Sequence, residues 1–100
     1  MKLPKTVQIS GKKYTVRKDN TMWGGNGGTA RQEIVVGTKK DQSCARQFEN
    51  FMHEVAELAA AEQHLRYEAA DDEVMFVMNH KQFNSFANDI ATAIMPMIKQ

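Results

Sequence analysis

Alternation of apolar and polar residues near the start of the chain predicts short β-strands. Residues 7–9 and 14–17 are two such runs, and the Ser10-Gly11-Lys12-Lys13 segment between them is a turn sequence. This arrangement predicts a β-hairpin. A third apolar run, residues 32–37, follows further along the chain. We therefore expect a three-stranded antiparallel sheet, made of the hairpin and one additional strand.

The apolar spacing changes to a helical period after residue 43. Asp41 or Ser43 can cap a helix over residues 43–65, because either side chain can accept from the free amides of the first turn. Its core-facing stripe comprises Phe48, Phe51, Met52, Val55, Leu58 and Ala59. Asn79 begins a second helix, whose apolar face comprises Phe83, Phe86, Ala87, Ile90, Ile94 and Met97, and Pro96 should bend or fray its end.

The remaining segments connect these elements. Residues 23–28 contain four glycines and predict a flexible loop, which lacks the Lys-Ser/Thr and the following helix of a phosphate cradle. Residues 68–73 form an acidic connection, followed by a short strand at 74–78. One hundred residues support one core, so we expect a single α+β domain over residues 1–100 with a shallow site.

Charge and cysteine content limit the function classes. Residues 1–46 hold ten Lys/Arg against three Asp/Glu, and residues 47–100 hold three against nine, giving +7 and −6. The basic charges are scattered without interleaved aromatic residues, which makes nucleic acid an unlikely partner.

The lone Cys44 permits no internal disulfide. No apolar stretch near the start is long enough for a signal peptide or membrane span, so we expect a soluble cytoplasmic protein.

Candidate chemistry centres on the segment His53-Glu54-Val55-Ala56-Glu57. His53 and Glu57 lie four residues apart, so their side chains project from one helix face about one turn apart, which suits two ligands of one metal ion. Glu54 lies about 100° further round, where a carboxylate can take a proton from an activated water. The same segment also fits the solvated face of an ordinary helix, because His53 and Glu57 lie nearly opposite the Phe48/Phe51/Val55 stripe.

A metal centre here needs a third protein ligand. His64 lies about 16 Å along the same helix and cannot share an ion with His53. His80, at the start of the second helix, is the better third ligand. The small side chains at positions 56 and 59–61 would let the second helix approach the first. We therefore expect the metal between the two helices, with the second helix closing over the polar face of the first.

The segment FENFMHEVAEL, residues 48–58, resembles the active-site helix of short phage-encoded zincin-like proteins distantly related to the ImmA/IrrE metallopeptidases, many of which read HExxE. A preceding strand, Glu33-Ile34-Val35-Val36, and the helix sequence HKQFNSFANDIATAI, which opens with His80, match in order. The resemblance implies zinc ligands His53, Glu57 and His80, with Glu54 as general base. The wider family uses HExxH and a downstream glutamate, and this chain departs from both.

Two functions follow from these observations. The first is a zincin-like phage or prophage metalloprotein that acts as a zinc-dependent peptidase, in which metal-activated water attacks a peptide bond and the strand at residues 33–36 holds the peptide by β-augmentation. The second is a non-catalytic module of the same fold that binds a protein partner. Both require a peptide or protein as substrate or partner.

Overall fold

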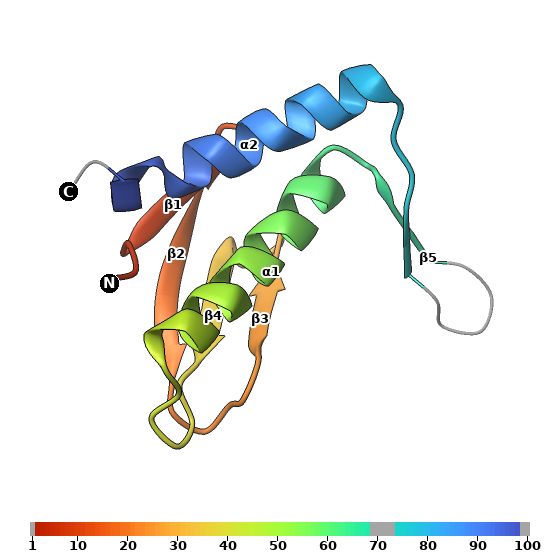
Figure 1. Cartoon of the computed structure of the whole chain (residues 1–100). Coiled ribbons are helices and arrows are strands. Elements are labelled where there is room, and N and C mark those ends of the chain that lie inside the picture. Colours follow the sequence, from red (N-terminus) through yellow and green to blue (C-terminus); the bar gives the residue numbers. More distant parts are fainter. Residues whose placement is uncertain (1, 69–73, 99–100) are drawn as a thin grey trace.

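The computed structural model describes residues 2–68 and 74–98, which form an α+β fold with a four-stranded sheet and two helices. Helix α1 (Cys44–Glu62) lies across one face of the sheet (Figure 1). Helix α2 (His80–Ile98) packs against β1 and against α1. The α+β class expected from the sequence is therefore confirmed, although the sheet differs from the expected one.

The first two strands form the predicted hairpin. β1 (Thr6–Ile9) pairs antiparallel with β2 (Lys12–Asp19), and Val7 faces Tyr14 across the pair. The two turn residues, Ser10 and Gly11, have φ angles of 50° and 78°. Positive φ at both central positions is the geometry of a type I′ turn, whose twist matches that of the flanking strands. Val7, Ile9 and Tyr14 point to the helical side and are buried.

The rest of the sheet corrects the expected three-stranded antiparallel arrangement. The strand order is β1-β2-β4-β3, and β4 (Glu33–Gly37) pairs parallel with β2. The glycine-rich segment expected to be a flexible loop is a strand, β3 (Gly25–Gly28), which pairs antiparallel with β4 at the sheet edge. Glycine has no side chain, so a glycine-rich strand lacks the apolar–polar alternation from which strands are predicted. For this reason the sequence pattern did not predict β3.

Helix α1 begins as predicted. Ser43, rather than Asp41, is its N-cap, and its hydroxyl oxygen accepts from the Arg46 amide at 3.2 Å. The face toward the sheet is buried and comprises Asn50, Phe51, Glu54, Val55, Leu58, Ala59 and Ala60. Phe51 and Val55 are fully buried against Ile34 and Val36 of the sheet in one core cluster.

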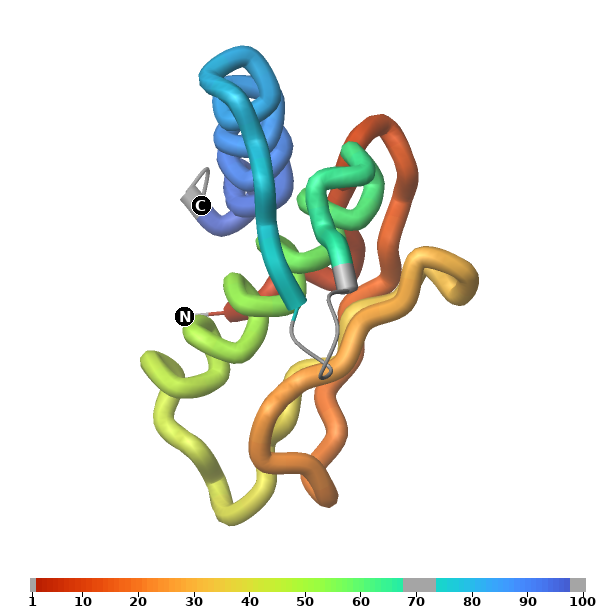
Figure 2. The backbone as a smooth tube through the Cα atoms, turned by 90° about the vertical axis from the view of Figure 1, so that its right-hand side faces the viewer, coloured from red at the N-terminus to blue at the C-terminus, as the bar shows by residue number. Residues whose placement is uncertain are grey.

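A two-stranded ribbon joins the helices. Only its second strand was predicted from the sequence. β5 (Arg66–Glu68) pairs antiparallel with β6 (Val74–Phe76), and the acidic connection expected between them falls mostly outside the described residues. Figure 2 shows the segment that leads from β6 to α2 passing in front of α1, on the side away from β1. Leu65 anchors the base of the ribbon, because it is fully buried and its carbonyl accepts from the Val77 amide at 3.1 Å.

Helix α2 is capped by Asn79, as expected. The Asn79 side chain accepts from the Gln82 amide at 2.9 Å, and the Gln82 side chain accepts from the Asn79 amide at 2.8 Å, which is a reciprocal capping arrangement. Ala93 is fully buried, whereas Phe83 is exposed, contrary to its expected place on the packed face. The helix continues through Pro96 to Ile98. Within the described chain, neither helix has the length and apolar content needed to cross a membrane.

Candidate metal centre

Three side chains on the middle of α1 form a group that could hold a metal ion. His53 Nε2 lies 3.4 Å from Glu57 Oε2 and 3.9 Å from Glu54 Oε2. One potential ligand atom from each residue lies within 4.8 Å of the other two. The helical period produces this group directly, because residues 53, 54 and 57 project from adjoining parts of one helix surface.

The three side chains differ in their exposure to solvent. The His53 side chain is 68% exposed and that of Glu57 is 36% exposed, whereas that of Glu54 is only 10% exposed. Burial raises the pKa of the Glu54 carboxyl, the nearby Glu57 raises it further, and His53 partly opposes this shift. A buried carboxylate beside a second carboxylate is an arrangement that a cation would neutralise.

Strand β3 covers Glu54, and its glycines make the approach possible. A Cβ atom added at Gly25 would lie 3.0 Å from Glu54 Cγ and 2.9 Å from the Val35 carbonyl oxygen. One added at Gly27 would lie 3.1 Å from a Leu58 methyl carbon and 3.5 Å from Glu54 Oε1. Any larger residue at Gly25 would therefore displace the Glu54 side chain or the strand. The glycines place the sheet edge directly against the group.

Two adjoining hollows flank Glu54. One, of about 280 Å³, is lined by Gly24 and Gly25 and by α1 residues that include His53. The other, of about 250 Å³, is lined by residues 27–29, by α1 residues that include Glu57, and by Arg66 of β5. No described residue of α2 lines either hollow. β3, rather than α2, therefore lines these hollows with this part of α1, and a metal between the two helices stays a prediction.

His80, the expected third ligand, lies outside the group. It is the first residue of α2, it is exposed, and it is not among the residues whose ligand atoms converge. Figures 1 and 2 both place the start of α2 beyond the C-terminal end of α1, whereas His53 is the middle residue of α1 (Cys44–Glu62). The third member of the group is instead Glu54, for which we predicted only the role of general base from the sequence.

The spacing of the donor atoms can be compared with that of two ligands around one metal ion. Two ligand atoms bound at about 2.0–2.2 Å in tetrahedral geometry lie about 3.4 Å apart, and the His53–Glu57 separation is 3.4 Å. The Glu54 oxygen is 0.5 Å further from His53. Zinc takes both imidazole nitrogen and carboxylate oxygen as ligands. His53 and Glu57 therefore have the spacing of two ligands, and Glu54 lies beside them.

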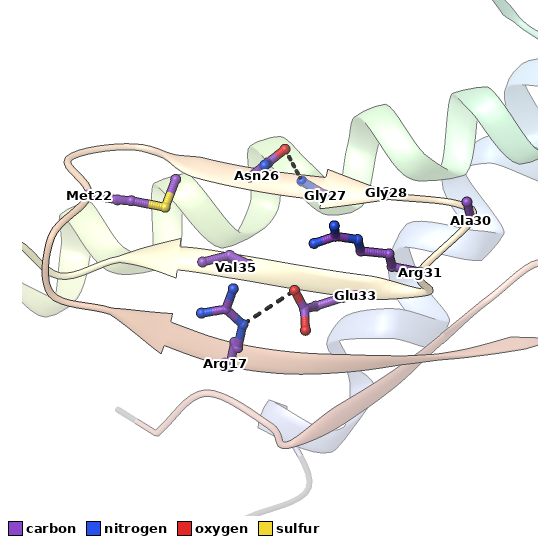
Figure 3. Close-up of a pocket in the computed structure, with 9 residues that line it drawn as sticks. All are labelled: Arg17, Met22, Asn26, Gly27, Gly28, Ala30, Arg31, Glu33 and Val35. Atoms are coloured by element: carbon purple, nitrogen blue, oxygen red, sulfur yellow. Dashed lines mark hydrogen bonds and ion pairs between the residues drawn. The ribbon is translucent and has the colours of Figure 1, made fainter.

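A further hollow, of about 410 Å³, lies on the opposite face of the sheet (Figure 3) and contains none of the three group members. Arg17 and Arg31 extend over β4, and Arg17 pairs with Glu33 at 3.2 Å. Arginine stems that lie over the sheet in this way explain why Val35 is only 5% exposed on a face that no helix covers. This hollow is best described as a solvated sheet face.

Comparison of the chain with family models, with curated proteins and with solved structures gives no match. The resemblance to zincin-like proteins rests on the residues quoted for it. The arrangement of those residues supports a candidate metal centre formed by His53, Glu54 and Glu57. The contribution of β3, through its glycines, and of Arg66 could not be inferred from the sequence, because both depend on pairing between distant segments.

Proposed function

We propose that this chain is a small zincin-like zinc protein of phage or prophage origin, and that it cleaves peptides. The observation that supports this best is the 3.4 Å separation of His53 Nε2 and Glu57 Oε2 beside the buried Glu54. In this proposal His53 and Glu57 are the two protein ligands of the ion, water takes the place of the third protein ligand expected from the sequence, and Glu54 is the general base. The ion, when bound, supplies a Lewis acid that polarises a carbonyl and makes water more acidic.

The buried position of Glu54 suits proton transfer. Desolvation and the charge of Glu57 raise its pKa, which makes its carboxylate a better proton acceptor. In the proposed reaction, Glu54 accepts a proton from the attacking water and delivers it to the leaving amine nitrogen. β3 packs closely against Glu54, because Gly25 and Gly27 carry no side chain that would meet it.

The peptide would lie along the edge of β3. The strand order leaves β3 at the edge, whereas β4, the strand expected to bind the peptide, is paired on both sides. An extended peptide can add to an exposed edge through main-chain hydrogen bonds, and glycines permit close approach. The Gly27 amide, which donates to Asn26 Oδ1 at 2.9 Å, would exchange this bond for one to the peptide.

The alternative is a non-catalytic module that uses the same edge to bind a protein partner. The departure from HExxH supports it, because a carboxylate in place of the second histidine adds negative charge to the site and makes its water less acidic. Zinc binding without cleavage would favour this alternative.

The proposal is tested by measuring zinc affinity through competition with a chromophoric chelator. The protein should be purified without a His tag. His53→Ala and Glu57→Ala should each weaken binding by at least about 100-fold, which exceeds the usual effect of outer-shell changes. His64→Asn is the matched control, since His64 is exposed and Asn tolerates its φ of 59°. Glu54→Gln should retain zinc and lower peptide cleavage by about 10²–10⁴-fold. Absence of zinc binding by the wild type would reject the metal centre.

A further inference from the structure

Two polar side chains of α1 are buried where the helix meets the start of β3. Asn50 and Glu54 are the buried polar or charged residues among those described, and each residue is 8% exposed overall. They lie four positions apart, so they project from one helix face about one turn apart. Both line the hollow of about 280 Å³ that also contains Gly25 and His53. A buried amide is unfavourable unless it is hydrogen-bonded, so the partner of Asn50 indicates its role.

The side chain of Asn50 reaches the segment that leads into β3. Its amide nitrogen donates to the Trp23 carbonyl oxygen at 3.0 Å. The carbonyls on either side are bonded elsewhere: those of Met22 and Gly24 accept from backbone amides within residues 37–39, at 3.0 and 2.6 Å. Of these three successive carbonyls, that of Trp23 is therefore the one that is bonded to α1.

β3 runs alongside α1 in a regular register. Added Cβ atoms at Gly25 and Gly27 would lie 3.0 Å from Glu54 Cγ and 3.1 Å from a Leu58 methyl carbon, respectively. Each step of two residues on the strand thus matches a step of four residues on the helix. The lengths agree, because two strand residues advance about 6.6 Å and four helix residues about 6 Å. The hydrogen bond from α1 to the segment before β3 is the preceding pair in this series, one step earlier in both elements.

The composition of β3 gives this hydrogen bond its importance. Three of the four residues of the strand are glycines, which offer no side chain for packing and lose the most conformational entropy when they are ordered. Within the described sheet, β3 lies at the edge and pairs with β4 alone. A side-chain hydrogen bond from α1 therefore supplies a contact on the helical side that the strand cannot make with side chains of its own.

We propose that Asn50 is a positioning residue of the candidate metal centre, and that its hydrogen bond to the Trp23 carbonyl holds the start of β3 against Glu54. The expected effects on zinc and cleavage rest on the proposed function. A carbonyl oxygen can only accept, so Asn50 acts as a donor, and a side chain of equal size without a donor would lose this role. Without the bond, β3 would separate from α1, and the surroundings of Glu54 would change with no loss of a ligand.

NMR of the metal-free protein tests this placement directly. In the wild type, a nuclear Overhauser effect should connect the Gly25 Hα protons with the Glu54 Hγ protons. Asn50→Leu keeps the size of the side chain and removes its donor, so it should abolish this effect. It should also speed hydrogen exchange of the β3 amides by up to about tenfold, as expected for the loss of one hydrogen bond.

Gln47→Leu is the matched control. Gln47 lies on the same helix, and its side-chain amide also donates to a backbone carbonyl, that of Gln42, at 2.7 Å. Because that acceptor lies outside β3, this variant should keep the nuclear Overhauser effect and the exchange rates of β3. Urea unfolding should show similar losses of stability for both variants, so a difference confined to β3 separates positioning from general stabilisation. Should Asn50→Leu not fold, Asn50→Ala removes the donor and retains a strong helix former.

Zinc affinity and peptide cleavage of the same variants connect this placement with the centre. Asn50→Leu should weaken zinc binding and lower cleavage by about tenfold each, the low end of the usual effect of outer-shell changes. Gln47→Leu should leave both within about twofold of the wild type.

Three results would overturn the inference: retention of the nuclear Overhauser effect in Asn50→Leu, its equal loss in both variants, or zinc affinity and cleavage that stay unchanged despite its loss. If the wild type binds no zinc, the metal centre fails, while the NMR comparison still decides whether Asn50 positions β3.

Discussion

At the residue scale, the position of Glu54 depends on the absence of a side chain at Gly25. We expect Gly25→Ala to weaken zinc binding and to lower the free energy of unfolding by about 1–3 kcal/mol, the usual cost of overpacking. The added Cβ would meet Glu54 Cγ at 3.0 Å and the Val35 carbonyl oxygen at 2.9 Å. Chelator competition and urea unfolding measure both effects.

Gly28→Ala is the matched control for this substitution, because it adds a Cβ to the same strand at a position with no neighbour within 4 Å. Equal effects of the two substitutions would mean that β3 flexibility, rather than contact with Glu54, controls the site.

A second prediction at this scale concerns His80. We expect His80→Ala to leave zinc affinity within about twofold of the wild type, since His80 is exposed and lies outside the converging group. His53→Ala, measured by the same competition assay, provides the comparison. A loss with His80→Ala as large as that with His53→Ala would require the start of α2 to close onto the centre of α1.

At the element scale, a buried polar contact joins the end of α1 to β2. The Tyr14 hydroxyl donates to Glu62 at 2.6 Å, and Lys12 Nζ lies 2.9 Å from the same carboxylate. Burial by itself would raise the pKa of Glu62, but the hydrogen bonds from Tyr14 and Lys12, with the charges of Lys12 and His64, outweigh it and lower the pKa below its ordinary 4.5. Burial and this same contact raise the pKa of Tyr14 above its usual range.

The lowered pKa predicts the pH dependence of stability. The carboxylate of Glu62 stabilises the fold above the unfolded-state pKa, and this contribution is lost as the pH falls below about 4.5. Tyr14→Phe should therefore cost about 1.5–3 kcal/mol at pH 7, where the hydrogen bond is to a charged group, and about 0.5–1.5 kcal/mol once Glu62 is protonated. Urea unfolding over a series of pH values from 7 downward measures the difference.

Tyr67→Phe removes a hydroxyl from an exposed tyrosine and serves as the control for Tyr14→Phe. It should change stability by less than about 0.5 kcal/mol at either pH. A pH-independent cost of Tyr14→Phe would mean that the hydroxyl contributes through packing rather than through the Glu62 charge.

At the scale of the whole molecule, charge divides between the sheet and the helices. The part with net charge +7 comprises β1 to β4, and the part with −6 comprises most of α1 and all of α2. Several basic groups already have partners: Arg17 pairs with Glu33, and Lys39 and Lys40 lie 5.7 and 5.3 Å from the Trp23 ring. The ion pair with Glu33 offsets the charge of Arg17, whereas Lys39 and Lys40 keep their charges, and the basic residues are scattered over the first 46 positions.

We therefore expect the protein to elute from heparin below about 0.15 M salt. Few basic groups would contact the polyanion together, so few counterions would be released on binding. Elution over a salt gradient, with a double-stranded DNA column as a second matrix, measures this. Retention well above that concentration, with a steep dependence on salt, would contradict the prediction and would favour nucleic acid as the partner.

The sequence by itself determined the features that arise within a few residues. The β1–β2 hairpin, the Ser43 cap, the Asn79 cap and the convergence of His53 with Glu57 all follow from local periodicity and turn chemistry. Such features depend on backbone geometry that neighbouring residues fix. For this reason helix geometry alone predicts the spacing of His53 and Glu57 on α1.

The tertiary structure decided which elements surround that spacing. β3 has no side-chain pattern to reveal it, and its pairing with β4, like the parallel pairing of β4 with β2, joins segments through long-range contacts. The same contacts placed glycines over Glu54, put α2 away from the centre of α1, and brought Arg66 of the ribbon to the hollow beside Glu57. The spacing of apolar residues indicates which face of a helix or strand is buried, but not which element packs against that face. The packing partner depends on how distant segments of the chain come together in one common core.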